Sequence, residues 1–177
     1  MTVSIGKRLV GGTLLGAALL VAGCVPSETV APQVAAGETP VEPVGPGTEQ
    51  ADAITATKIL QKVCVDTAPS FKKAPAVMAK MPFRQHPVTG TFYHQNLDLS
   101  IKLMSKRCSM VFTSKDDPIV LSIAISAAGG KQSSGSIDLD PSNGSSMTKT
   151  KTGLTIELDA MGRDNGRNWY RAVVLAP

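Results

Sequence analysis

The feature that most limits what this chain can fold into is the segment that ends at Cys24. Lys7 and Arg8 are followed by an apolar stretch from Leu14, which closes with small residues directly before Cys24. A charged start, a short apolar region and a small-residue cleavage site are typical of a secretory signal peptide. We therefore expect residues 1–23 to be removed, and the fold to form from the rest of the chain in an oxidising, exported compartment.

The same segment is poorly suited to cross a membrane as a helix. Its apolar run from Leu9 to Val25 is interrupted by several glycines, whereas a spanning helix needs about 20 mostly apolar residues. An uncleaved membrane anchor and an ordinary secreted product are the two alternatives to the interpretation that follows.

The residues Val21-Ala22-Gly23-Cys24 resemble the lipobox of bacterial lipoproteins. The resemblance implies cleavage before Cys24, a diacylglyceryl thioether on its sulfur and an N-linked acyl chain. Because stable membrane attachment takes more than one acyl chain, this modification would anchor the protein. The resemblance also favours the outer membrane, if the cell has one, because Val25 and not an aspartate follows the cysteine. It extends no further along the chain.

Residues 25–51 are expected to form a flexible tether. They contain five prolines and four glutamates, with no Lys, Arg or aromatic residue. Such a composition cannot bury enough apolar surface to offset the entropy of ordering. In an extended form, at about 3.1 Å per residue, the tether would span roughly 80 Å. The expected organisation is a signal peptide over 1–23, a lipidated Cys24 with its tether over 24–51, and one globular domain over 52–177.

The expected domain is mildly basic, with 16 Lys and Arg residues against 10 Asp and Glu residues from Asp52 onward. A basic surface can meet anionic lipid, peptidoglycan or an acidic protein, although charge that merely keeps the domain soluble is the simpler explanation. Nucleic acid is not an expected partner, because exported proteins do not normally meet it.

Three segments predict helices. From Asp52 to Val65, apolar residues recur at helical spacing on one face. A second helical piece is expected from Ser70 to Met81, interrupted by a proline. Residues 118–128 alternate as a strand would, but an Asp-Asp-Pro start and a Gly-Gly stop favour a helix there.

Alternation of apolar and polar residues predicts strands at Leu97 to Leu103 and at Cys108 to Phe112, after a short one at 92–94. Three more antiparallel strands are expected at 147–151, 154–158 and 169–175, with turns at 133–135 and 141–146. We therefore expect the α+β class: a small single domain with an antiparallel sheet of about five to six strands, packed by two to three helices and held by one disulfide.

The disulfide is expected between Cys64 and Cys108. Cys64 lies on the apolar face of the first expected helix, and Cys108 lies on the inward side of an expected strand. The bond would close a loop of about 45 residues and stabilise the fold by roughly 4 kcal/mol. A redox-active or metal-binding pair is the weaker alternative, because such cysteines are normally spaced as Cys-x-x-Cys.

The two histidines, His86 and His94, flank a predicted turn and could converge on a metal ion. Met78 and Met81 would add the soft ligands that suit copper. The simpler explanation is that the methionines belong to the apolar side of a helix and that His86 lies in a loop. Copper or zinc binding is therefore kept as an alternative only, and no cofactor is expected.

The chain has no catalytic signature: it lacks a Gly-x-Ser-x-Gly elbow, a His-Glu-x-x-His motif and a phosphate-binding glycine loop. The strand that holds Trp169 and Tyr170 places one ring on each face, so one belongs to the core and the other is the best candidate for a binding aromatic. We expect a lipid-anchored envelope protein that is a non-enzymatic binding module for an envelope protein or polymer. A hydrolase acting on envelope polymers is the main alternative.

Overall fold

A computed structural model describes residues 45–140, 142 and 144–177 of the chain. The expected signal peptide, the lipidation site Cys24 and most of the expected tether lie outside these residues. Within the part of the chain that is described, no helix is long and apolar enough to cross a membrane.

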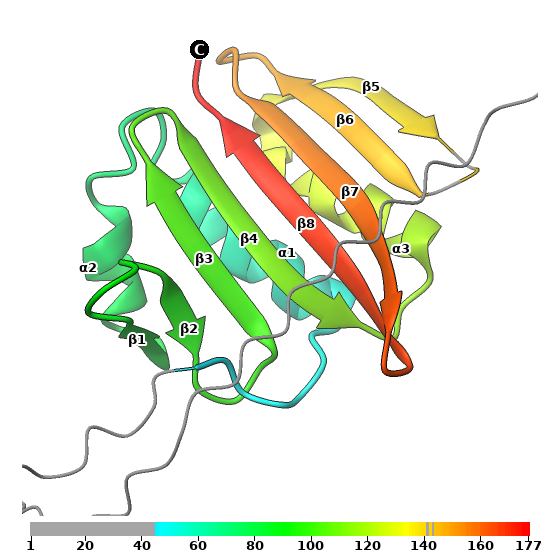
Figure 1. Cartoon of the computed structure of the whole chain (residues 1–177). Helices are drawn as coiled ribbons and strands as arrows, with labels where there is room; N and C mark the ends of the chain where they lie inside the picture. Colours follow the sequence, from blue (N-terminus) through cyan, green and yellow to red (C-terminus); the bar gives the residue numbers. More distant parts are fainter. Residues whose placement is uncertain (1–44, 141, 143) are drawn as a thin grey trace, which may run out of the picture. The chain divides into compact units, whose positions relative to one another are not determined.

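The domain is built on one antiparallel sheet of eight strands in the order β1-β2-β3-β4-β8-β7-β6-β5 (Figure 1). The strands are β1 (Phe83–Gln85), β2 (Phe92–His94), β3 (Leu99–Met104), β4 (Arg107–Ser114), β5 (Ser133–Asp140), β6 (Ser145–Thr150), β7 (Thr155–Asp164) and β8 (Arg167–Leu175). The sheet is therefore larger than the expected five to six strands. The additions are its two outermost strands, β1 and β5, which form because β2 and β6 offer them an edge for backbone pairing.

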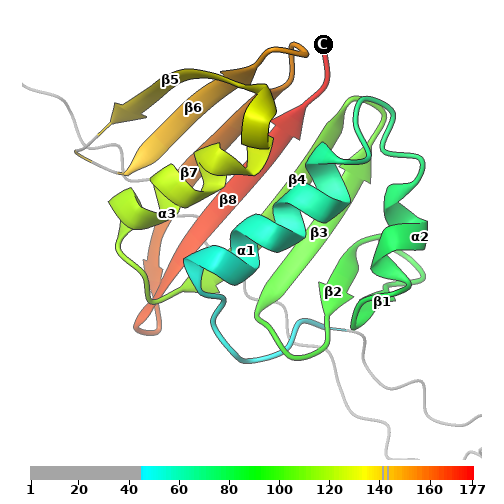
Figure 2. The same ribbon diagram turned by 180° about the vertical axis from the view of Figure 1, so that it is seen from behind.

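The helices lie on one face of this sheet (Figure 2). They are α1 (Ala53–Leu60), which continues as the π-helix η1 (Gln61–Val65), α2 (Ala74–Met78), and α3 (Pro118–Ser126), which continues as the 3-10 helix η2 (Ala127–Gln132). The α+β class, with three α-helices against one sheet, is thus confirmed. In the described part of the chain no helix covers the opposite face, which we call the outer face of the sheet.

The helix starts follow the expected capping chemistry. The Asp52 carboxylate accepts a hydrogen bond from the Thr55 amide, and that of Asp117 accepts one from the Ile119 amide. The segment from Pro118 is therefore a helix despite its alternating pattern. The second expected helix is shorter than the predicted range Ser70 to Met81, because Pro75 in the first turn fixes its start and turns flank it on both sides.

The topology repeats once along the chain. A helix followed by four strands, α1 with β1–β4, is succeeded by α3 with β5–β8, and the last strand of each half pairs in the centre of the sheet. Within this junction Phe112 of β4 lies opposite Tyr170 of β8, with ring centroids 5.7 Å apart. One core thus spans both halves beneath α1 and α3.

Residues Gly47 to Ala51 belong to the domain, although the sequence placed them in the tether. The Gly47 amide donates to the carbonyl oxygens of His94 and Leu97, and the Ala51 amide donates to that of Thr113. A side chain at Gly47 would lie 2.1 Å from the Asn96 backbone, so only glycine fits there. We call residues 47–51 the strap.

Candidate functional site

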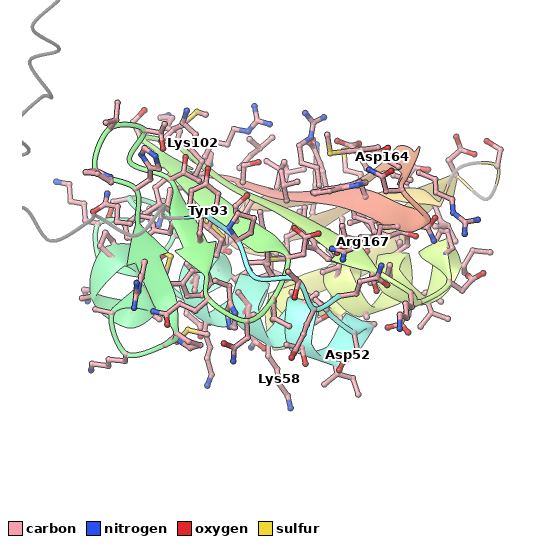
Figure 3. All side chains as sticks on the ribbon, turned by 60° about the horizontal axis from the view of Figure 1, so that its bottom comes forward. Asp52, Lys58, Tyr93, Lys102, Asp164 and Arg167 are labelled. Carbon is pink, nitrogen blue, oxygen red and sulfur yellow. A yellow bond between two sulfur atoms is a disulfide. The ribbon has the colours of Figure 1, made fainter. Side chains whose placement is uncertain are left out.

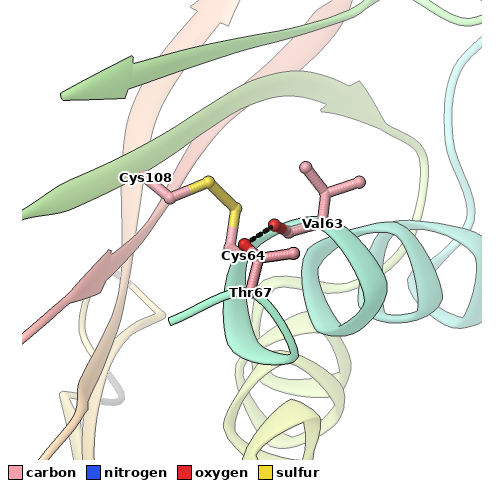
Figure 4. Close-up of a disulfide and its surroundings, with 4 residues drawn as sticks. All are labelled: Val63, Cys64, Thr67 and Cys108. Carbon is pink, nitrogen blue, oxygen red and sulfur yellow. Dashed lines mark hydrogen bonds between the residues drawn. A yellow bond between two sulfur atoms is a disulfide. The ribbon is translucent and has the colours of Figure 1, made fainter. Parts of the chain in front are cut away.

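The predicted disulfide between Cys64 and Cys108 is present (Figure 4). Cys64 lies in η1 and Cys108 in β4, with their Cα atoms 5.6 Å apart and both residues fully buried. Beside it, the Thr67 hydroxyl donates a hydrogen bond to the Val63 carbonyl oxygen and closes the end of the helix. The bond joins the helical layer to the sheet, so its role is structural.

Both histidines close turns. The Nδ1 atom of His86, in the β1–β2 turn, accepts hydrogen bonds from the Val88 and Thr89 amides at 3.2 and 3.3 Å. The Nδ1 atom of His94 accepts from the Asn96 and Leu97 amides at 3.3 and 3.0 Å. Each imidazole thus satisfies backbone donors that the turn would otherwise leave unpaired.

The positions of the histidines and methionines do not support the alternative of copper or zinc binding. Met78 is fully buried in the core and Met81 packs against it, while the Nδ1 atoms of His86 and His94 face the backbone amides described above. Across the described ranges, no three or more His, Cys, Asp or Glu residues gather where they could hold a metal ion.

Burial lowers the pKa of His94, and the nearby Glu49 carboxylate offsets part of that effect. The ring is enclosed by neighbouring groups that include Phe83, whose centroid lies 5.0 Å away at nearly a right angle. His94 is therefore held as a neutral imidazole that accepts at Nδ1, which suits a structural role.

Two of the carboxylates that could serve acid–base chemistry, Asp98 and Asp159, have basic partners. Asp98 is buried and accepts hydrogen bonds from the Thr113 hydroxyl at 3.2 Å and from Arg167 at 2.9 Å. Asp159 accepts two from Arg171, at 3.1 and 2.7 Å. Both carboxylates are thus engaged in charge-assisted hydrogen bonds with arginine side chains of β8.

The hollows of the described surface include three with ionisable side chains in their lining. One, of about 560 Å³, lies beside the strap and is lined by residues that include Asp52 and Arg167, both of which are labelled in Figure 3. Asp52 caps α1 and Arg167 pairs with Asp98, so both of these charged side chains have a structural role. Another, of about 540 Å³, lies between η1 and η2 and has Asp66 as its single ionisable side chain. The third, of about 240 Å³, is an acidic groove on β5, β6 and β7. No histidine lines any of them.

The two candidate aromatics point to opposite faces. Tyr170 is 1% exposed, and burial, followed by the nearby acidic side chains of Asp117 and Asp116, raises its pKa. Trp169 is partly exposed on the outer face and lies opposite Gly162 of β7. Tyr170 is thus a core residue, and Trp169 is the member of the pair that a partner could touch. A large ring beside a glycine also has a structural role, because it covers the sheet where the glycine has no side chain.

Sequence reasoning missed an exposed apolar surface on α3. Ile119, Val120 and Ile123 are 41%, 52% and 53% exposed, and Ile54 on the neighbouring α1 is 66% exposed. We call these four residues the α3 patch. From Pro118 to Gly130 the chain has no charged residue. This lack of charge is visible in the sequence, but a fully buried helix would show the same pattern. Ile119, Val120 and Ile123 lie within five consecutive residues of one helix, and exposed apolar side chains gathered in this way mark interaction sites.

Comparison of the chain with known protein families, with curated proteins and with solved structures gave no match.

Proposed function

We propose that this is a lipid-anchored protein of the bacterial envelope whose domain is a non-enzymatic binding module. The anchor is supported by the lipobox resemblance at Cys24 and by the proline-rich segment that follows. The buried disulfide between Cys64 and Cys108 suits an exported protein, because such bonds persist in oxidising compartments.

The observation that carries the binding proposal is the α3 patch. A solvent-facing helix normally carries charged residues on its outer side, whereas α3 exposes Ile119, Val120 and Ile123 there and has no charge along its length. Burying three such side chains at an interface would contribute a few kcal/mol at about 25 cal/mol per Å². The apolar character favours a protein partner over a polysaccharide, which would need hydrogen-bonding groups.

Catalysis is the less favoured function. No histidine lines the described hollows. His94 lies near the Glu49 carboxylate, but its Nδ1 atom accepts hydrogen bonds from two backbone amides. Asp98 and Asp159 are held in ion pairs. A hydrolase would need at least one such group free to take up or release a proton during the reaction.

Site-specific photocrosslinking in cells tests the binding proposal. A photoreactive residue at Ile123 should give one defined adduct, and the same residue at the exposed Lys151, in the turn between β6 and β7, should not. Val120→Lys should then abolish the Ile123 adduct without lowering the melting temperature. Indistinguishable adducts from positions 123 and 151, or hydrolysis of envelope polymers by the purified protein, would contradict the proposal.

The anchor is tested separately by labelled fatty acid. The wild-type protein should incorporate the label, and Cys24→Ser should abolish the incorporation and release the chain from the membrane. Labelling that persists in Cys24→Ser would show that the acylation site is wrong.

A further inference from the structure

One stretch of the domain carries basic residues and no acidic ones. Residues 67–97, which include α2, β1 and β2, contain four Lys or Arg residues and no Asp or Glu. The four are exposed, three of them beside α2 and one within β1: Lys72, Lys73, Lys80 and Arg84. We call these four residues the basic edge, because β1 is the outermost strand on this side of the sheet and α2 lies beside it in both views (Figures 1 and 2).

The opposite side of the sheet carries a group of carboxylates. The acidic groove over β5, β6 and β7 is lined by Asp138, Asp140, Glu157 and Asp159. The two ends of the sheet therefore differ in charge. The end at β1 has basic residues and no acidic ones, whereas carboxylates gather at the end near β5. Charge that served solubility alone would have no reason to separate in this way.

An apolar tip projects from the basic edge. Val88, in the β1–β2 turn, is 87% exposed. The turn is closed by the Gly90 amide, which donates to the His86 carbonyl oxygen, and by the two amides that donate to the His86 ring. A defined turn thus holds Val88 out in solvent instead of letting it fold back.

The strap begins near the same edge of the sheet. The strap begins at Gly47, whose amide is bonded to His94 at the end of β2 and to Leu97 just before β3. The chain that leads back toward Cys24 therefore joins the domain beside β2, the neighbour of β1. An anchored chain would keep the domain within reach of the lipid, and the basic edge lies near the point where the strap begins.

We propose that the basic edge and Val88 dock the domain onto the anionic phospholipid surface of the membrane that holds the chain. This inference rests on the proposed lipid anchor, since the anchor supplies the proximity. Each Lys or Arg near an anionic surface strengthens binding by about fivefold, and insertion of an apolar side chain such as Val88 adds about tenfold. The docked domain would leave the α3 patch, which lies on other elements, available to a partner.

Vesicle binding by an unacylated chain tests the proposal. The full chain from Val25 onward, exported without the lipobox cysteine, should bind vesicles of phosphatidylglycerol and phosphatidylcholine but not vesicles of phosphatidylcholine alone. Raising the salt from about 0.1 M to about 0.5 M should weaken the binding, because the Debye length shortens.

Matched variants locate the binding surface. The triple variant Lys72→Gln, Lys73→Gln and Lys80→Gln should bind about 100-fold more weakly, by the same charge dependence. The control, with the same loss of charge at exposed lysines of other elements, should bind like wild type: Lys58→Gln, Lys115→Gln and Lys151→Gln. Val88→Gln should weaken binding by about tenfold. Because the Val88 side chain is highly exposed, this substitution should not disturb the fold, so misfolding would not explain the weaker binding.

Equal binding by the two triple variants, or equal binding to neutral vesicles, would overturn the inference. Binding to soluble polyglutamate but not to vesicles would also overturn it, and would identify an acidic macromolecule as the partner. Because the tested chain is unacylated, vesicle binding reports on the domain surface alone, whereas fatty-acid labelling of the wild-type chain reports on the anchor.

Discussion

Arg167 donates a hydrogen bond from its guanidinium group to the Asp98 carboxylate at 2.9 Å, and this ion pair joins β8 to the residue that precedes β3. The Thr113 hydroxyl, which is fully buried, donates to the same carboxylate oxygen. Asp98 thus connects the two halves of the domain at the end of the sheet that the strap crosses.

We predict that Asp98→Ala lowers the free energy of unfolding by about 2–3 kcal/mol, because it leaves the buried Thr113 hydroxyl without an acceptor. Urea denaturation measures this loss. Asp159→Ala is the control, since both partners of the Asp159–Arg171 pair are about 40% exposed, and exposed pairs contribute under about 1 kcal/mol. A similar cost for the two variants would contradict the structural role given to Asp98.

Removing the disulfide should lower the free energy of unfolding by more than Asp98→Ala does. Replacing Cys64 and Cys108 with alanine opens a loop closed across a sequence separation of 44 residues, and should lower the free energy of unfolding by about 4 kcal/mol in the chain-entropy treatment. Reductant should destabilise the wild-type protein by a similar amount in urea denaturation. It should have no effect on the double variant; a reductant effect there would mean that another thiol reaction is involved.

His94 should make stability depend on pH. Burial lowers its native pKa below the ordinary value of 6.5, so the unfolded chain binds a proton more readily than the native one. The contribution of the neutral ring is therefore complete above about pH 6.5 and is lost as the pH falls toward the lower native pKa.

The matched variant for this prediction is His94→Asn, whose side-chain oxygen can accept the Asn96 and Leu97 amides without titrating. The difference in unfolding free energy between wild type and His94→Asn should be constant above about pH 7 and shift against the wild type below about pH 6.5. A difference that does not change between these conditions would exclude the proposed titration.

Gly47→Ala should detach the strap. Its Cβ would lie 2.1 Å from the Asn96 backbone, whereas a Cβ at Gly45 would have nothing within 4 Å. We expect a loss of about 1–3 kcal/mol for Gly47→Ala and no measurable loss for Gly45→Ala. Hydrogen exchange at the Ala51 amide should also become faster in Gly47→Ala alone, and equal exchange in both variants would show that the strap does not depend on this close approach.

The sequence predicted the strands and helices in which buried and exposed side chains follow a regular pattern. The stretches that became β3, β4 and β7 alternate because one face packs on the helices and the other faces solvent. The start of α3 was predictable because Asp117 and Pro118 are local capping signals. Burial and capping are properties of a few neighbouring residues, which is why one sequence sufficed.

Other features depend on residues far away in the chain and could not be foreseen. β5 is rich in Ser and Gly and is a strand because β6 supplies its hydrogen bonds. The choice of Tyr170 over Trp169 for the core depends on the register with β4, which places Tyr170 opposite Phe112. The strap was assigned to the tether because its composition does not reveal the backbone partners that hold it.

The position of β8 has a consequence for the order in which the domain forms. This strand is the last element of the domain along the chain, yet it fills the middle of the sheet between β4 and β7. Until the residues up to Leu175 are in place, β4 and β7 each have an unpaired inner edge. The two halves of the sheet can therefore join only in the last step of folding, after the C-terminal strand has been inserted between them.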